Sequence, residues 1–303
     1  MKPLSPRRIA VTGSRGLIGR ALMAALAGAG YAVRGLDLRA SDGQQGDVRT
    51  RADVEGLLDG CIGVIHLAAV SRVIDGERDP HGCWRTNVEG TANVLDVART
   101  SGRPWVVYAS SREVYGQPPT LPASDDAPLN PVNIYGRSKV AAEELTRSCD
   151  LLTAIVRFSN VYGWTGDHSD RVIPAFARQA VLGERLRVDG SSHSFDFTHL
   201  EDTVRGVMAV TARLEAGAEL PPLHLLTGTP TTLGHLASLA VSLAGTVSTI
   251  CEAPPRSYDV SSFHGDPSRS EELLGWRAHV GLEDGLARLI AEFRAGLRTS
   301  EVA

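Results

Sequence analysis

The sequence lacks the features that mark several large classes of protein. It has no excess of basic residues, because its formal net charge is −4 at pH 7. Nucleic acids and anionic membranes attract basic surfaces, so this charge favours a small-molecule partner over either. No apolar run reaches the roughly 20 residues of a membrane-spanning helix, and residues 1–6 lack the apolar core of a signal peptide. We therefore expect a cytoplasmic protein with neither a membrane nor a nucleic-acid partner.

Cysteine is scarce and shows no metal-binding spacing. There is no C-x-x-C pair and no cluster of cysteine and histidine among Cys61, Cys83, Cys149 and Cys251. Such a distribution favours reduced residues over metal ligands or disulfides, and we assign no metal. Internal repeats and low-complexity linkers are also lacking. The 303 residues, 43% of them hydrophobic, can bury a large core in one big α/β domain or in two closely packed lobes.

Three glycines near the N-terminus stand where a phosphate could bind. Gly13, Gly16 and Gly19 follow a short β-branched run and begin an alanine-rich helix. A backbone without side chains lets a pyrophosphate approach, and the exposed amides of a helix N-terminus favour its charge. We predict that these glycines, with Leu17 and Ile18, bind a dinucleotide. The alternative for this G-x-x-G-x-x-G spacing is a tight turn without a ligand.

Asp37 ends the next apolar run, where a dinucleotide-binding fold has an acid on the adenosine ribose. Because a carboxylate there repels a 2′-phosphate, Asp37 favours NAD over NADP, although Arg34 and Arg39 lie near enough in sequence to accept that phosphate. His66, in a later buried strand, is predicted to be a core histidine rather than a catalyst. The other cofactor contacts that we predict are Asp47, Val48, Leu67, Ala68, Ala69 and Asn87.

A serine, a tyrosine and a lysine point to acid–base chemistry. Strands and helices alternate four times before Ser111, which predicts a doubly wound parallel sheet with its ligand at the carboxyl ends of the strands. Tyr135 and Lys139 stand four apart at a helix start and so share one face. A phenol with a pKa of about 10 needs nearby positive charge to act as a base, which Lys139 can give. The hydroxyl of Ser111 can hold the same substrate oxygen. The alternative for Tyr135 and Lys139 is a surface pair.

The regular alternation decays after the strand that ends near residue 158, which indicates a second, smaller lobe. We predict that residues 1–158, with about 196–224, form a dinucleotide-binding domain. Residues of about 159–195 and 225–303 would form a smaller α/β substrate lobe, interleaved with the first along the chain.

An ordered set of short motifs runs through the chain: the glycine turn, Asp37, His66-Leu67-Ala68-Ala69, Ser111, Val114-Tyr115-Gly116, Tyr135 with Lys139, and residues 157–163. With this set the chain resembles the extended short-chain dehydrogenase/reductases, and within them the NAD-dependent nucleotide-sugar epimerase/dehydratase family. The resemblance implies a Rossmann-type doubly wound parallel sheet, a tightly held NAD, a smaller lobe for the nucleotide diphosphate, and a homodimer. It also implies that the tyrosine is the base, that the lysine lowers its pKa and binds the nicotinamide ribose, and that the serine is the hydroxyl partner.

The substrate that the resemblance implies is a sugar joined to a nucleoside diphosphate. The residues that we predict to bind it are Ser71, Ser111, Asn160, Arg171, Arg187 and Arg256. One departure concerns Phe195, which stands where many members have an arginine before Asp-Phe-Thr. Arg171, Arg178 or Arg187 would replace the missing cation, or the nucleotide would bind differently.

Three functions remain open at this point. The first is an NAD-dependent epimerase, at C4 of a nucleotide-linked hexose or uronic acid, that acts through a transient 4-keto sugar. The second is a dehydratase or decarboxylase in which Glu113 acts after the same oxidation. Arg112 stands where 4,6-dehydratases have an aspartate, and an arginine cannot give up a proton at neutral pH, which weakens the dehydratase. Glu113 alone could still serve a decarboxylase or a different eliminase. The alternative for Glu113 is a structural pair with Arg112 or another cation. The third function is a non-catalytic NAD sensor, which the retained Ser111, Tyr135 and Lys139 disfavour.

Overall fold

The centre of the molecule is a parallel sheet of six strands in the order β2-β1-β3-β4-β5-β9, in which all neighbouring strands run parallel. The structure is a computed structural model and describes residues 7–255 and 260–301. The strands are β1 (Arg8–Thr12), β2 (Ala32–Leu36), β3 (Gly63–His66), β4 (Trp105–Ser111), β5 (Thr153–Phe158) and β9 (Leu223–Leu225). The strand order reverses between β1 and β3, and ligands of such sheets bind at the carboxyl ends of the strands beside this reversal.

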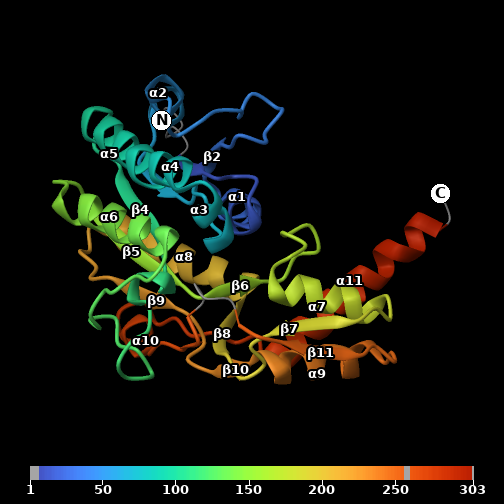
Figure 1. Cartoon of the computed structure of the whole chain (residues 1–303). Helices are drawn as coiled ribbons and strands as arrows, with labels where there is room; N and C mark the ends of the chain where they lie inside the picture. Colours follow the sequence, from blue (N-terminus) through green and yellow to red (C-terminus); the bar gives the residue numbers. More distant parts are fainter. Residues whose placement is uncertain (1–6, 256–259, 302–303) are drawn as a thin grey trace.

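Helices cover both faces of this sheet (Figure 1). They are α1 (Leu17–Gly28), α2 (Arg51–Leu58), α5 (Gly90–Thr100), α6 (Ile134–Ser148) and α8 (Leu200–Glu215). Apolar side chains of α1 and α8 pack on one face, and those of α2 and α5 pack on the other. Because both faces are covered, β4 is buried along its whole length, as expected for a central parallel strand. The predicted doubly wound parallel sheet is confirmed.

Short helices connect β3 to α5 and lie beside α6. They are α3 (Val73–Arg78), α4 (Pro80–Trp84) and the π-helical turn η1 (Arg85–Glu89). A 3₁₀ turn, η2 (Arg112–Tyr115), follows β4 directly. All of these segments therefore begin near the carboxyl ends of the central strands.

The second half of the chain builds two smaller sheets. One contains β6 (Asn160–Tyr162), β8 (Ser194–His199), β10 (Pro230–Thr232) and β12 (Ser262–Phe263), and the other pairs β7 (Leu186–Asp189) with β11 (Ile250–Ala253). The remaining helices are α7 (Val172–Val181), α9 (Leu233–Ala244), α10 (Ser268–Leu274) and α11 (Leu282–Glu301). Apolar residues of α7, α9 and α11 share a core with these strands, beside the large sheet in Figure 1. The whole of β8 lies in a smaller sheet, and α8 then packs on the large one.

A buried ion pair anchors α6 to the large sheet. Arg157 of β5 donates to both carboxylate oxygens of Glu143 on α6, at 2.9 and 2.7 Å, and Ser110 of β4 donates to the same carboxylate at 2.5 Å. The side chains of Arg157 and Glu143 are 2% and 0% exposed. Because both charges are paired and hydrogen-bonded, they can be buried together. The pair holds the third turn of α6 against β4 and β5.

Candidate active site

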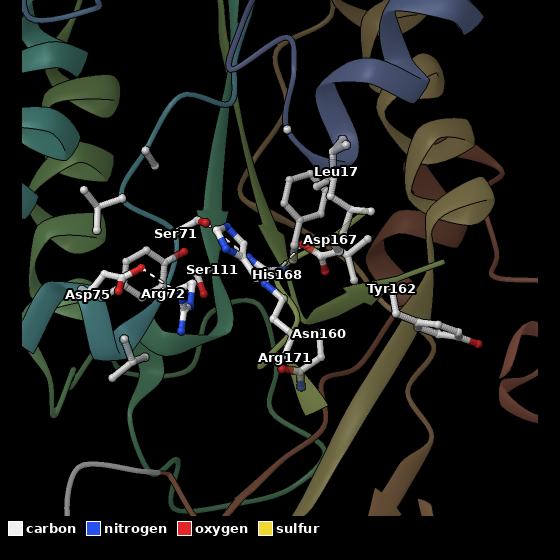
Figure 2. Close-up of a pocket in the computed structure, with 18 of the residues that line it drawn as sticks. Leu17, Ser71, Arg72, Asp75, Ser111, Asn160, Tyr162, Asp167, His168 and Arg171 are labelled. Atoms are coloured by element: carbon white, nitrogen blue, oxygen red, sulfur yellow. Dashed lines mark hydrogen bonds and ion pairs between the residues drawn. The ribbon is translucent and has the colours of Figure 1, made fainter. Parts of the chain in front are cut away.

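A cavity of about 1070 Å³ lies at the carboxyl ends of the large sheet, between it and the smaller sheets (Figure 2). Nineteen of the residues predicted from the sequence line it: Gly13, Gly16, Leu17, Ile18, Gly19, Asp37, Asp47, Val48, Leu67, Ala68, Ala69, Ser71, Ser111, Glu113, Tyr135, Lys139, Asn160, Arg171 and Arg187. Asn87 does not line the cavity, and Arg256 lies outside the described residues.

Close packing requires glycine, which has no side chain, at two positions of the glycine turn. Gly13 has a φ of +68°, and a Cβ atom added to it would lie 2.9 Å from the backbone nitrogen of Ala68. A Cβ atom on Gly19 would lie 2.1 Å from the carbonyl oxygen of Gly13. Gly16 then caps α1 with no side-chain hydrogen bond, so the first amides of this helix are free to bind an anion. The turn therefore fits the pyrophosphate of a dinucleotide.

Asp37 lies at the end of β2, as expected for a ribose-binding acid. Its carboxylate accepts hydrogen bonds from the backbone N–H groups of Arg15 and Arg39, both at 2.9 Å. The side chain is 7% exposed, whereas that of Arg39 is 62% exposed. The two backbone donors thus hold a carboxylate in the cavity wall, and the largely exposed guanidinium of Arg39 also pairs with it, with Nε 3.5 Å from Oδ1. Asp47, also in the wall, binds the guanidinium of Arg49, which lowers the pKa of this aspartate.

Polar side chains support the stretch that follows β3. Thr12 accepts hydrogen bonds from the backbone N–H groups of Leu67 and Ala68. The ring of His66 lies between the hydroxyls of Thr12 and Thr91, at 2.7 and 3.0 Å. Burial, and then the charge of Lys139, lowers the pKa of His66 to about 3. The ring is therefore neutral and satisfied, as a core histidine would be.

Asn87 supports the cavity from behind its wall. Its amide oxygen accepts from the backbone N–H of Val70 at 2.8 Å, and its amide nitrogen donates to the carbonyl of Val70 and to the hydroxyl of Ser138. The side chain thus connects the segment after β3 to α6. In this structure Asn87 positions other residues and does not reach the cavity itself.

Ser111, Tyr135 and Lys139 meet at the carboxyl end of β4. Asn133 caps α6 by accepting a hydrogen bond from the N–H of Gly136 at 2.8 Å, which starts the helix so that Tyr135 and Lys139 face the strand. The ammonium of Lys139 donates to the carbonyl of Ala109 at 2.7 Å and lies 5.9 Å from the centre of the Tyr135 ring. The predicted trio is therefore assembled in one place.

The environment of the trio shifts the pKa values of Tyr135 and Lys139. Burial raises the pKa of Tyr135 to about 12, opposed by a hydrogen bond with Ser111 and by the positive charge of Arg171. Burial lowers the pKa of Lys139 to about 8. At neutral pH the phenol is therefore protonated and the lysine is largely charged. Nearby cations are what make the phenolate accessible, because they stabilise its negative charge.

Glu113 is fully engaged by its neighbours. One carboxylate oxygen pairs with Arg112 at 2.8 Å, and the other accepts from the side-chain amide of Asn133 at 2.8 Å. Glu113 still lines the cavity, but neither oxygen is free of a partner. The structural alternative considered for this residue, a pair with Arg112, is the arrangement that the structure has.

The loop before α7 crosses to the segment after β3. Arg171 donates to the hydroxyl of Ser71 at 3.2 Å, so two residues predicted to bind substrate contact each other (Figure 2). Arg72 pairs with Asp75 and with Asp170 of this loop. Elsewhere in the wall, Asn160 donates to the carbonyl of Asp196 at 3.1 Å, and Arg187 pairs with Asp189 at 2.7 Å.

Many residues of the cavity wall were not predicted as site residues from the sequence, among them Arg72, Arg112 and Trp164. Trp164 lies against Arg20 of α1, with the guanidinium carbon 4.0 Å from the ring centre. Arg72 directly follows Ser71, and Arg112 directly follows Ser111. Adjacency to a predicted contact was thus the available signal for both arginines.

No helix in the described part of the chain has the length and apolar character needed to cross a membrane. Within residues 7–255 and 260–301, no three potential metal ligands gather. The four cysteines are unpaired.

The parallel sheet, the glycine turn and the tyrosine–lysine pair over one cavity define an extended short-chain dehydrogenase/reductase. Comparison with known families gives the particular group: residues 9–221 match the NAD dependent epimerase/dehydratase family, and the chain belongs to it.

Individual relatives agree with this assignment. A UDP-glucose 4-epimerase of Mycolicibacterium smegmatis is 30% identical over 311 residues, covering 95% of this chain and 98% of the relative. MoeE5 has been solved with NAD and UDP-glucose, at 29% identity over 96% of this chain and 99% of MoeE5. It has also been solved with NAD and UDP-glucuronic acid, at 28% identity over 95% and 99%; the TM-score is 0.87 in both comparisons. DesIV, a dTDP-glucose 4,6-dehydratase of Streptomyces venezuelae, has a TM-score of 0.87 at 26% identity, covering 96% of this chain and 98% of DesIV.

These comparisons confirm four predictions made from the sequence. They are the family, the fold class, NAD as the cofactor, and an NAD-dependent nucleotide-sugar epimerase as the kind of enzyme.

Proposed function

We propose that the protein is a 4-epimerase of a UDP-linked sugar. The observation that carries this proposal is the assembly of Ser111, Tyr135 and Lys139 beside a glycine turn, while both carboxylate oxygens of the neighbouring Glu113 are engaged by Arg112 and Asn133. When bound, NAD supplies the reversible oxidation of the sugar carbon. Its pyrophosphate would be held by the glycine turn and its adenosine ribose by Asp37.

The protein's own residues hold the sugar and move a proton. Ser111 and Tyr135 hydrogen-bond the C4 hydroxyl, and Tyr135, once it has released its own proton to solvent, accepts the hydroxyl proton as the alcohol becomes a ketone. The charge of Lys139 stabilises the phenolate during this step. After the 4-keto sugar has turned in the cavity, Tyr135 returns the proton to the C4 oxygen. Asn160, Arg171, Arg187 and Arg256 are the proposed contacts of the nucleotide sugar.

The alternative is elimination or decarboxylation after the same oxidation, which the likeness to DesIV supports. Against it, both oxygens of Glu113 are engaged, and the residue before it is Arg112. Replacing Glu113 by glutamine distinguishes the two functions. An epimerase should keep its rate within about tenfold, whereas an eliminase that uses Glu113 as acid or base should lose about 100-fold or more.

The proposed function is tested on purified protein without added cofactor. UDP-, dTDP-, GDP- and CDP-linked hexoses and uronic acids are incubated with it, and products are identified by mass and NMR. An unchanged mass with an inverted C4 supports the epimerase and indicates that NAD copurifies. Loss of water or carbon dioxide supports the alternative. The Tyr135→Phe variant is the control, because it removes the proton acceptor and keeps the ring.

We also propose the division of labour, the assembly and the location that the sequence suggested. The cofactor would be bound by one domain, made of residues 1–158 and about 196–224. The nucleotide sugar would be bound by the smaller lobe, made of residues of about 159–195 and 225–303. The homodimer is tested by light scattering on the purified protein, which would give twice the chain mass of 32.2 kDa. The cytoplasmic location is tested by cell fractionation.

A further inference from the structure

Arg112 is a buried cation between the two walls of the cavity. It directly follows β4, and its guanidinium carbon lies 4.6 Å from the ring centre of Phe195 on β8 and 5.8 Å from that of Phe263 on β12. The side chain is 12% exposed and lines the cavity. Two aromatic faces therefore fix the plane of the guanidinium.

The hydrogen-bonding capacity of this guanidinium is largely unused. An arginine has five N–H donors in a planar fork. In the described residues Arg112 has one ion-pair partner, Glu113, and its Nη1 is buried without any hydrogen-bond partner. Glu113 cannot turn to cover more donors, because Asn133 holds its other oxygen. Charged donors with few partners are costly, and the accessible part of this guanidinium lines the cavity, so a ligand that supplies oxygen atoms there is stabilised.

Arg112 is less exposed than the other arginines of the cavity wall. Exposed side-chain fractions are 18% for Arg72, 30% for Arg171, 62% for Arg39 and 70% for Arg187, against 12% for Arg112. Arg72 pairs with two carboxylates. Charge interactions strengthen as water is excluded, so an anion is attracted most strongly by the most buried of these cations, which is Arg112.

We propose that Arg112 binds a carboxylate at C6 of the sugar, so that the substrate is a nucleotide-linked uronic acid rather than a neutral hexose. This inference rests on the proposed function, which has Ser111 and Tyr135 on the C4 hydroxyl. Arg112 lines the same cavity as Ser111 and Tyr135, and C6, which is carried by the carbon next to C4, is the substituent of this region that is commonly a carboxylate. The planar fork of arginine matches the two oxygens of a carboxylate. Phe195 provides the face on which this cation rests.

The test compares Arg112→Met with the unchanged enzyme on a UDP-linked uronic acid and the UDP-linked hexose of the same configuration. Methionine keeps an apolar stem on Phe195 and removes the charge. We expect the unchanged enzyme to have the higher kcat/KM on the uronic acid. In the variant the ratio of uronic acid to hexose kcat/KM should fall about 30-fold, the factor that corresponds to one charge-assisted hydrogen-bonded pair. Arg112→Lys, which keeps the charge without the fork, should fall between the two.

Arg99→Met is the matched control, because Arg99 is 56% exposed on α5 and pairs with Asp96. It should leave the ratio unchanged. Equal loss on both sugars, together with weaker inhibition by UDP, would mean that Arg112 serves the diphosphate and would overturn the inference. A preference of the unchanged enzyme for the hexose would overturn it as well.

If no nucleotide sugar is turned over, the proposed function fails, and binding still decides the role of Arg112. Calorimetry of UDP-glucuronic acid and UDP-glucose should then show a preference for the acid that Arg112→Met removes. Equal affinities in the unchanged protein would refute the inference independently of catalysis.

Discussion

Replacing Lys139 by methionine should make the protein more stable while it destroys activity. Burial lowers the pKa of Lys139 from 10.5 to about 8. At about 1.4 kcal/mol for each tenfold change in proton affinity, charging this lysine is about 3 kcal/mol less favourable in the folded protein than in the unfolded chain. Methionine removes that cost. It also removes the hydrogen bond to Ala109, which is worth about 1 kcal/mol. The variant should therefore gain about 2 kcal/mol in free energy of unfolding at pH 7.

The pH dependence of this gain has a definite sign. A lysine with a lowered pKa in the folded state destabilises the fold below about pH 8, where both states are charged. The cost shrinks as the pH rises from about 8 to 10.5, because the folded protein loses its proton first. Above 10.5 it is absent. The gain of the variant should thus be full at pH 7 and should have disappeared at pH 10.5.

The assay is urea unfolding of the cofactor-free protein at both pH values, with epimerase activity measured in parallel. The sequence has two lysines, Lys2 and Lys139, so NMR of protein labelled with ¹³C at lysine Cε can follow each titration directly. Lys2→Met is the control and should change neither stability nor rate. A Lys139→Met variant that is less stable than the unchanged protein at pH 7 would refute the reasoning, as would a titration of Lys139 near its ordinary pKa of 10.5.

Two further changes test the cofactor turn and the anchor of α6. Gly19→Ala should abolish copurification of NAD, seen by absorbance after denaturation, because its Cβ would lie 2.1 Å from a backbone oxygen of the glycine turn; Gly28→Ala, whose Cβ would meet nothing within 4 Å, should retain NAD. Arg157→Met should lower the free energy of unfolding by about 3–5 kcal/mol, because it leaves Glu143 buried and without its main partner. Arg147→Met removes a 40%-exposed partner of the same carboxylate and should cost less than about 1 kcal/mol. Equal losses in the two arginine variants would contradict the buried-pair argument.

Local patterns were sufficient to predict that Ser111, Tyr135 and Lys139, the proposed reacting residues, lie together. Helical spacing put Tyr135 and Lys139 on one face, and the end of an apolar run put Ser111 at the edge of a parallel sheet. Both rules depend on backbone periodicity, which the sequence displays directly. The decay of the strand–helix alternation indicated the smaller lobe. The sugar nucleotide came from the family resemblance, because no spacing in the chain indicates it.

Contacts between distant segments were beyond such patterns. Asn87 was predicted to bind the cofactor, yet its amide bonds Val70 and Ser138, and that choice depends on how α6 packs. The state of Glu113 was left open until the structure brought Asn133 to its second oxygen. The contact of Arg112 with the Phe195 ring could not be predicted from the sequence either, because it joins η2 to a strand of another sheet.

The cavity draws its two walls from separate sheets, and this has a consequence for how such an enzyme changes over generations. Ser111, Tyr135 and Lys139 belong to the wall built on β4 and α6, which the buried pair under α6 anchors. The opposite wall comes from β6, β8 and the loop before α7. Substitutions there can alter which sugar fits while the reacting groups stay in register, so new substrates can arise without a lineage losing its chemistry. Arg112 starts in one wall and rests on the other, so with the role proposed for it a single substitution there would change the preferred sugar.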